Sequence, residues 1–185
     1  MFDDLNDLYQ QVILDHCKQP RNFHEMPAAT CSAQGHNPLC GDNLKLFLTL
    51  DGDVIKDASF VGSGCCISKA SASLLTDNVK GKTKAEAETM FERVREMVTT
   101  GKVNGDMGKL AVFAGVHKYP ARVKCAILSW HALMGALKGK RSRSAQKPKT
   151  AKITSGGAVK ILLTRGQYLD YYLNIETIWT SCSEL

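Results

Sequence analysis

The chain has 185 residues, of which 44% are hydrophobic and 23% charged, values typical of a globular protein that can bury one ordinary core. No run approaches the roughly 18 apolar residues that a membrane span needs, and the first five residues are acidic where a signal or transit peptide would be basic. We therefore expect one compact domain with an appendage, a cytoplasmic location and no membrane partner.

Apolar residues at helical spacing predict an amphipathic helix from Asp4 to His16, which Pro20 would end. Leucines then alternate with other residues from Leu44 to Leu50. The Asp51-Gly52 turn and a second run from Val54 to Val61 follow, so this part of the sequence predicts a β-hairpin.

The second half of the domain predicts further helices. The run of small residues from Ile67 to Leu75 permits close helix packing, and Thr83 with Glu86 forms a capping box that opens a helix toward Thr99. An apolar stripe predicts the last clear helix from Ala121 to Leu137. Helices gathered beside a small antiparallel sheet indicate an α+β domain.

The pattern changes near the end of this helix, so we divide the chain into a domain of residues 1–139 and a tail of residues 140–185. Much of the net charge of +6 comes from Lys138–Lys149, which we interpret as a solvated basic linker rather than a nucleic-acid-binding surface. The tail continues with Ala158–Leu163 and a patch of tyrosines. We expect the tail to be poorly ordered and leave its Cys182 out of the site.

The seven cysteines are the first candidates for a functional site. Their number is odd, and the reducing conditions of the cytoplasm argue against a disulfide framework and for metal or thiol chemistry. Free cysteine is also commonly a small buried hydrophobe, so each must be weighed against that interpretation. We interpret Cys17 as inert on the first helix, Cys31 as lacking a suitable neighbourhood, and Cys66 as pointing away from Cys65.

Three other cysteines have neighbourhoods that suit a metal. Cys40 and Asp42 lie two residues apart on a turn shaped by Pro38 and Gly41, so a thiolate and a carboxylate can ligate one ion there. Cys65 follows a glycine-rich turn where a helix is predicted to begin, and the helix dipole favours its thiolate.

Cys125 lies in the first turns of the last predicted helix, where Arg122 and Lys124 add positive charge that also favours thiolate. Three thiolates with one carboxylate would complete the four-coordinate shell that zinc prefers, and soft sulfur donors suit iron–sulfur clusters equally well. A purely structural zinc module usually has paired Cys-x-x-Cys knuckles, which this chain lacks. A thiol hydrolase is disfavoured because no histidine is linked by motif to a candidate nucleophile.

Four motifs, spread in order over residues 3–139, resemble the SufU branch of the IscU and NifU N-terminal family of iron–sulfur cluster assembly proteins. They read Leu8-Tyr9-x-x-Val12-Ile13-Leu14-Asp15-His16 with Pro20-Arg21-Asn22, Asn37-Pro38-x-Cys40-Gly41-Asp42, Gly62-x-Gly64-Cys65-x-Ile67-Ser68-x-Ala70-Ser71-Ala72-Ser73, and Pro120-Ala121-Arg122-x-Lys124-Cys125-Ala126-x-Leu128-Ser129-Trp130.

The resemblance implies a SufE/NifU-like α+β fold, in which helices pack against a small three-stranded antiparallel sheet. It also implies that the metal ligands are Cys40, Asp42, Cys65 and Cys125, that the three cysteines bind the cofactor, and that Cys40 is the catalytic thiolate. The cofactor implied is zinc, or alternatively iron or an iron–sulfur cluster at the same site.

The function implied is that of a zinc-dependent sulfur acceptor that takes persulfide sulfur from a SufS-type cysteine desulfurase and passes it to downstream iron–sulfur assembly proteins or apoproteins. Lys124 stands where the IscU scaffolds carry histidine, which favours this interpretation. The alternative is a scaffold that assembles a labile cluster and transfers it to apoproteins. We expect no nucleic-acid partner.

Overall fold

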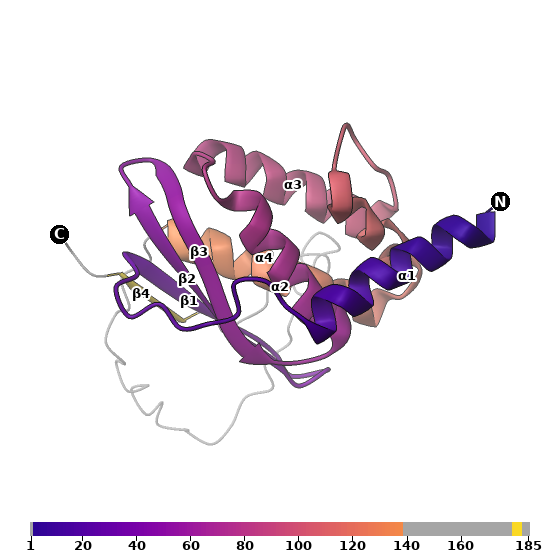
Figure 1. The fold of residues 1–185 in the computed structure, drawn as a ribbon, viewed down its shortest axis with the longest axis horizontal. Coiled ribbons are helices and arrows are strands. Elements are labelled where there is room, and N and C mark those ends of the chain that lie inside the picture. The colour runs from indigo at the N-terminus through magenta and orange to yellow at the C-terminus, as the bar shows by residue number, and fades with distance from the viewer. Residues whose placement is uncertain (1, 139–178, 183–185) are drawn as a thin grey trace, which may run out of the picture.

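The computed structural model describes residues 2–138 and 179–182, and its helices lie together on one side of a β-sheet (Figure 1). In chain order the elements are α1 (Phe2–Lys18), β1 (Cys31–Asn37), β2 (Asp42–Asp51), β3 (Val54–Ser63), α2 (Cys66–Val79), α3 (Lys84–Thr100), the 3-10 helix η1 (Gly108–Lys118), α4 (Pro120–Leu137) and β4 (Trp179–Cys182). Helices α2 and α4 pack directly on the sheet, and α1, α3 and η1 pack on these two helices. The predicted α+β class is confirmed.

The sheet has the strand order β3-β2-β1-β4, and every pair is antiparallel. Strands β2 and β3 form the predicted hairpin, whose turn places Gly52 at a φ of 58°, a conformation that glycine adopts without steric cost. The β1–β2 connection is longer, because four residues separate the paired Asn37 and Asp42, whereas two separate Asp51 and Val54 in the β2–β3 hairpin. The predicted three-stranded antiparallel sheet is confirmed, and β4 adds a strand beside β1 that the sequence did not predict.

The predicted helices are also present. Thr83 and Glu86 form the predicted capping box at the start of α3, because Glu86 N donates to Thr83 Oγ1 at 3.2 Å and Thr83 N donates to Glu86 Oε2 at 2.8 Å. The helix ends at Gly101, which has a φ of 78°. After the loop of residues 101–107, the 3-10 helix η1 occupies most of the segment before α4.

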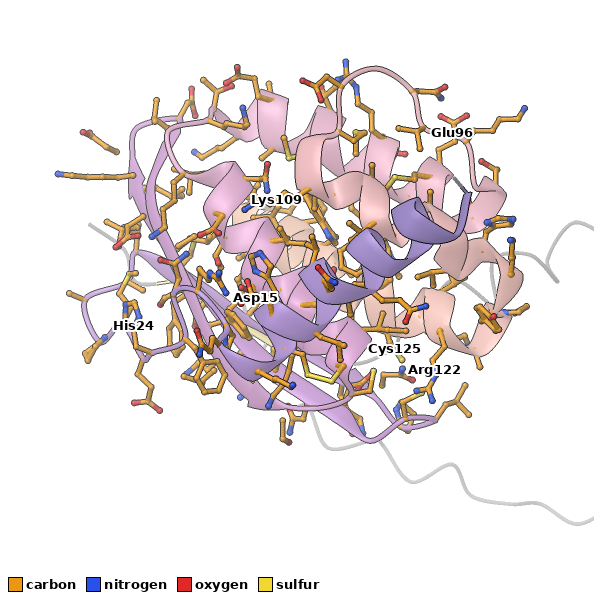
Figure 2. The ribbon with its side chains drawn as sticks, turned by 45° about the vertical axis from the view of Figure 1, so that its right-hand side comes forward. Asp15, His24, Glu96, Lys109, Arg122 and Cys125 are labelled. Carbon is orange, nitrogen blue, oxygen red and sulfur yellow. A yellow bond between two sulfur atoms is a disulfide. The ribbon has the colours of Figure 1, made fainter. Side chains whose placement is uncertain are left out.

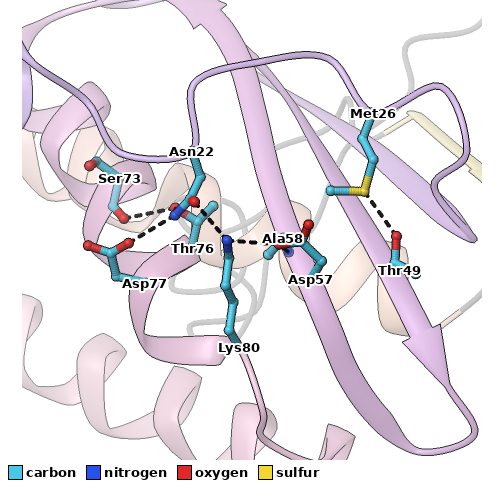
Figure 3. Close-up of polar contacts among 9 residues, drawn as sticks. All are labelled: Asn22, Met26, Thr49, Asp57, Ala58, Ser73, Thr76, Asp77 and Lys80. Atoms are coloured by element: carbon cyan, nitrogen blue, oxygen red, sulfur yellow. Dashed lines mark hydrogen bonds and ion pairs between the residues drawn. The ribbon is translucent and has the colours of Figure 1, made fainter.

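In the Pro20-Arg21-Asn22 motif, which follows α1, the Asn22 side chain bonds to residues of α2 and to Lys80 (Figure 3). Asn22 Nδ2 donates to Thr76 Oγ1 at 3.1 Å and to Asp77 Oδ1 at 2.9 Å, while Asn22 Oδ1 accepts from Lys80 Nζ at 2.7 Å. The same lysine forms an ion pair with Asp57 at 2.8 Å. This motif therefore fixes the segment after α1 rather than contributing a ligand.

One expectation about the cysteines is wrong, because Cys17 near the end of α1 and Cys66 at the start of α2 form a disulfide. Cys17 is therefore not inert, although Cys66 does point away from the candidate ligand beside it. The packing of α1 on α2 brings the two Cα atoms to 4.9 Å, within the range that a disulfide spans. The two residues are 49 positions apart, so the pairing depends on the tertiary fold.

Most of the tail lies outside the described residues, including the basic linker after Lys138, the segment Ala158–Leu163 and the tyrosine patch. The boundary at residue 139 and the poor order of the tail thus stay predictions, and β4 is the tail segment that the structure describes. Among the described helices, none is long and apolar enough to cross a membrane.

Candidate metal centre

Three parts of the chain meet at one end of the sheet and bring the candidate ligands together. The β1–β2 turn carries Cys40 and Asp42, Cys65 is the N-cap of α2, and Cys125 lies in the second turn of α4. One ligand atom each from Cys40, Asp42 and Cys125 lie within 4.8 Å of one another. That group of three does not include Cys65, whose Sγ is nevertheless 3.9 Å from Asp42 Oδ2.

Asp42 is fully buried, and its two oxygens have different partners. Oδ1 accepts a hydrogen bond of 2.7 Å from the backbone N–H of Cys65, which links the β1–β2 turn to the start of α2. Oδ2 faces the sulfur atoms and accepts from Asn37 Nδ2 at 3.3 Å. A buried carboxylate is costly unless it is paired, so the position of Oδ2 beside thiols suits a bound cation.

Asn37 is a positioning residue that the sequence reasoning did not single out. Its side chain is buried, and Nδ2 lies 3.3 Å from Asp42 Oδ2 and 3.4 Å from Cys125 Sγ. Its Oδ1 accepts from the backbone N–H of Leu39 at 3.3 Å, which sets the orientation of the amide. The signal available in the sequence was its place at the start of the Asn37-Pro38-Leu39-Cys40-Gly41-Asp42 turn.

The thiols of Cys65 and Cys125 are electrostatically coupled. The hydrogen bond from the Cys125 thiol lowers the pKa of Cys65 to about 6, and the backbone N–H groups of Ser68 and Ile67 at the start of α2 act in the same direction. The same hydrogen bond, together with burial and the Asp42 carboxyl group, raises the pKa of Cys125. Without a metal, these opposite shifts favour negative charge on Cys65 and the proton on Cys125.

Cys40 lies on the outer side of the cluster. It is half-buried, and Arg122 Nη1 donates to its Sγ at 3.7 Å. Arg122 and Cys125 lie beside each other near the start of α4 (Figure 2). Hydrogen bonding to Cys125 and the charges of the other thiolates raise the pKa of the exposed Arg122 side chain. The neighbouring Leu39 is 70% exposed, so the turn that carries Cys40 is open to a partner protein.

The donor set fits a metal ion of the kind expected. Three thiols and one carboxylate match the tetrahedral N, S and O coordination of zinc, and thiolates equally suit iron–sulfur clusters. The other cysteines do not belong to this cluster: Cys31 is buried at the start of β1, Cys17 is bonded to Cys66, and Cys182 lies in β4. The assignment of all four predicted residues as ligands stays a prediction.

Comparison with known proteins decides the family, since residues 8–126 match the NifU-like N terminal domain. The chain belongs to this family. The predicted family resemblance is thereby confirmed, and the matched range contains all four candidate ligands of this NifU-like domain.

The NifU-like domain is similar to proteins of iron–sulfur cluster assembly. It is 43% identical over 132 residues to the zinc-dependent sulfurtransferase SufU of Bacillus subtilis, covering 70% of this chain and 89% of that protein. It is 42% identical over 145 residues to the iron–sulfur cluster assembly scaffold protein IscU of Streptococcus pyogenes, covering 77% of this chain and 89% of that protein.

A solved structure described as an iron–sulfur cluster assembly scaffold protein for the SUF system, from Fervidobacterium islandicum, has the same fold. It matches with a TM-score of 0.66 and 35% identity, covering 69% of this chain and 94% of that chain. A NifU-like protein of Brucella abortus, at 22% identity and a TM-score of 0.64, supports the fold alone.

Proposed function

We propose that this NifU-like domain is a zinc-dependent sulfur acceptor, which takes persulfide sulfur from a SufS-type cysteine desulfurase for iron–sulfur cluster assembly. The observation that carries the proposal is the cluster of Cys40, Asp42 and Cys125 within 4.8 Å, with Cys65 beside Asp42. The similarity to a zinc-dependent sulfurtransferase supports zinc as the metal.

The arrangement gives the chain's residues different roles. Zinc, when bound by Cys40, Asp42, Cys65 and Cys125, would stabilise the thiolates at neutral pH. The buried Asp42 and Cys125 form the inner side of the site, where a partner's persulfide has no direct access. Cys40 is half-buried on a surface turn, and the nearby Arg122 guanidinium stabilises negative charge on its sulfur.

Sulfur transfer to Cys40 then follows from thiol exchange chemistry. The Cys40 thiolate attacks the outer sulfur of the desulfurase persulfide, and a new sulfur–sulfur bond forms on Cys40. The sulfur–sulfur bond in the desulfurase breaks, and its electron pair returns to the desulfurase cysteine as a thiolate. The outer sulfur keeps its proton, so Cys40 carries a persulfide that can pass to downstream assembly proteins or apoproteins.

A cluster scaffold is the second candidate, because relatives of similar identity are named as scaffolds. The same thiolates would hold iron or an iron–sulfur cluster. Lys124 favours the sulfur-acceptor function, because lysine at neutral pH is a cation and a poor metal ligand, which leaves Asp42 and three thiolates to complete the shell. The expected cytoplasmic location stays a prediction.

The decisive experiment compares zinc-loaded and iron-reconstituted protein in two assays. One measures sulfide release by a SufS-type desulfurase with cysteine and reductant, and the other measures cluster transfer to an apoprotein. We expect the zinc-loaded chain to stimulate sulfide release and to gain a persulfide on Cys40. Cys40→Ala should abolish the stimulation, and Cys31→Ala, which removes a buried cysteine of β1, should retain it.

Elemental analysis of freshly purified protein gives an independent answer on the metal. About one zinc per chain, lost on Cys65→Ser and retained on Cys31→Ala, would support the proposal. Stimulation only by iron-reconstituted protein, together with efficient cluster transfer, would replace it with the scaffold function.

A further inference from the structure

The Cys17–Cys66 disulfide lies directly beside the candidate metal centre. Cys66 is the first residue of α2, and the candidate ligand Cys65 immediately precedes it as the N-cap. Cys17 is the next-to-last residue of α1. The disulfide therefore ties the end of α2 that carries Cys65 to a neighbouring helix (Figure 2).

The hydrogen bonds that join the end of α1 and the segment after it to α2 are made to later turns of α2. His16 Nδ1 and the backbone N–H of Arg21 both lie 2.8 Å from Ser73 Oγ, and Asn22 contacts Thr76 and Asp77. These bonds hold the middle and the C-terminal half of the helix. They leave its first turn to other contacts.

The first turn of α2 begins without one of the usual Ser, Thr, Asn or Asp N-cap residues. Its N-cap, Cys65, makes no side-chain capping hydrogen bond, and the structure shows its backbone N–H bonded to Asp42 Oδ1 instead. The covalent bond at Cys66 is thus a strong restraint on the position of Cys65 relative to α1. Without it, the first turn is held by the Asp42 bond, the helix hydrogen bonds and the packing of Ile67 and the buried Ser68, and no covalent bond joins it to α1.

We propose that Cys17 and Cys66 form a redox site, in which the disulfide holds Cys65 firmly and its reduction loosens Cys65 and speeds metal exchange. The disulfide is accessible, because Cys66 is exposed and Cys17 is half-buried. The inference rests on the proposed role of Cys65 as a metal ligand.

Reduction needs two electrons and two protons, which a dithiol of small-molecule or protein origin supplies. One thiolate of the dithiol attacks Cys66 Sγ, the Cys17–Cys66 bond breaks, and Cys17 leaves as a thiolate that takes up a proton. The second thiol of the reductant then attacks the mixed disulfide. This step releases the Cys66 thiol and leaves the reductant as a disulfide, so atoms and electrons balance.

The test uses the full chain loaded with zinc alone, in the disulfide form and after treatment with a phosphine. A phosphine reduces the disulfide without adding competing thiols, because it becomes a phosphine oxide with oxygen from water while the two thiols take the protons. Zinc release to a chromogenic chelator is then followed. Loss of a group that orients a metal ligand typically lowers metal affinity about 10- to 100-fold. We expect reduction to have an effect at the lower end of this range and to speed zinc release about tenfold.

Two variants separate this effect from other effects of the phosphine. Cys17→Ser should release zinc at the fast rate with or without phosphine, whereas Cys31→Ala should respond like the unmodified chain. Equal release rates for the disulfide and reduced forms, or the absence of a Cys17–Cys66 linked peptide by mass spectrometry, would overturn the inference.

A second readout does not depend on zinc. In the metal-free chain, amide hydrogen exchange in the first turn of α2 should be faster in the reduced form than in the disulfide form, while exchange in α3 should be unchanged. Unchanged exchange in α2 would overturn the inference even if zinc binding is confirmed. Loss of zinc binding with faster exchange would instead count against the proposed function and leave the redox restraint supported.

Discussion

Replacing Gly64 by alanine tests whether the position of Asp42 controls the metal centre. A Cβ atom at Gly64 would lie 2.7 Å from Asp42 Oδ1, whereas ordinary van der Waals contact begins at 3.4 Å. The carboxylate must therefore move by about 0.7 Å, the difference between these two distances. Gly64 does not have a left-handed φ, so alanine adds this clash without backbone strain.

The displaced carboxylate would have a weaker hydrogen bond to Cys65 and a changed distance to the thiols. The backbone nitrogen of Cys65 lies 2.7 Å from Oδ1, and a shift of this size away from it would lengthen and weaken this hydrogen bond. Hydrogen bonds to charged groups contribute about 1.5–3 kcal/mol. We expect zinc affinity to fall about 10- to 100-fold, which corresponds to about 1.4–2.7 kcal/mol.

The assay is a competition titration of zinc between the chain and a chromogenic chelator, with circular dichroism to confirm folding. Gly115→Ala is the matched control, because a Cβ atom at Gly115 in η1 meets nothing within 4 Å. Folded Gly64→Ala protein that binds zinc as tightly as the Gly115→Ala control would refute the argument that the Asp42 carboxylate must occupy its observed position.

Three further predictions follow from the described residues. In metal-free protein, the rate of Cys65 alkylation should rise with pH and level off above about 6, because its pKa is lowered to about 6 and the thiolate predominates above that value. Cys125, whose pKa is raised, should react far more slowly, and equal rates for the two cysteines at pH 7 by peptide mapping would contradict this. Under oxidising conditions, Cys17→Ser should lower the free energy of unfolding by about 4 kcal/mol, because the disulfide closes a loop between residues 49 positions apart. An unchanged urea midpoint of unfolding would contradict this. A chain ending at Lys138 should keep its metal content, since α1–α4 and β1–β3 lie before that point. It loses β4, a strand of four residues beside β1, so its melting temperature should change little, and a drop of many degrees would show that the tail stabilises the domain.

Local sequence patterns predicted the elements whose periodicity is strong, and β1 shows why they missed another. The inward positions of β1 include Cys31 and Ala33, and Gly35 follows at the same spacing. These residues are small because α4 packs closely on the strand: a Cβ atom at Gly35 would lie 3.1 Å from Leu128 Cδ1. A strand selected for close helix packing lacks the alternating large residues by which a strand is recognised.

The candidate site, like the fold, was predictable only where its residues are close in sequence. Cys40 and Asp42 are close in sequence, and a turn rich in proline and glycine suggested that they lie together. The arrival of Cys125 beside them depends on the packing of α4 against β1, which no local pattern encodes. The Cys17–Cys66 disulfide was missed for the same reason, because only the packing of α1 on α2 brings its two cysteines together.

The burial of the candidate ligands argues against sulfur exchange at Cys125 and leaves the two half-buried thiols, Cys40 and Cys65. Cys125 and Asp42 are fully buried, and each is bonded to a group that restricts its movement. Cys40 is held by a short surface turn beside an exposed leucine, and the guanidinium of Arg122 contacts its sulfur. Exchange with a protein persulfide requires the attacking sulfur to approach the sulfur–sulfur bond, so the thiol at the surface reacts while the buried residues retain their arrangement. Cys65 is half-buried as well, but its backbone N–H is bonded to Asp42 at the start of α2, whereas Cys40 lies on the turn. This difference favours Cys40 as the sulfur acceptor, with Asp42, Cys65 and Cys125 as its support.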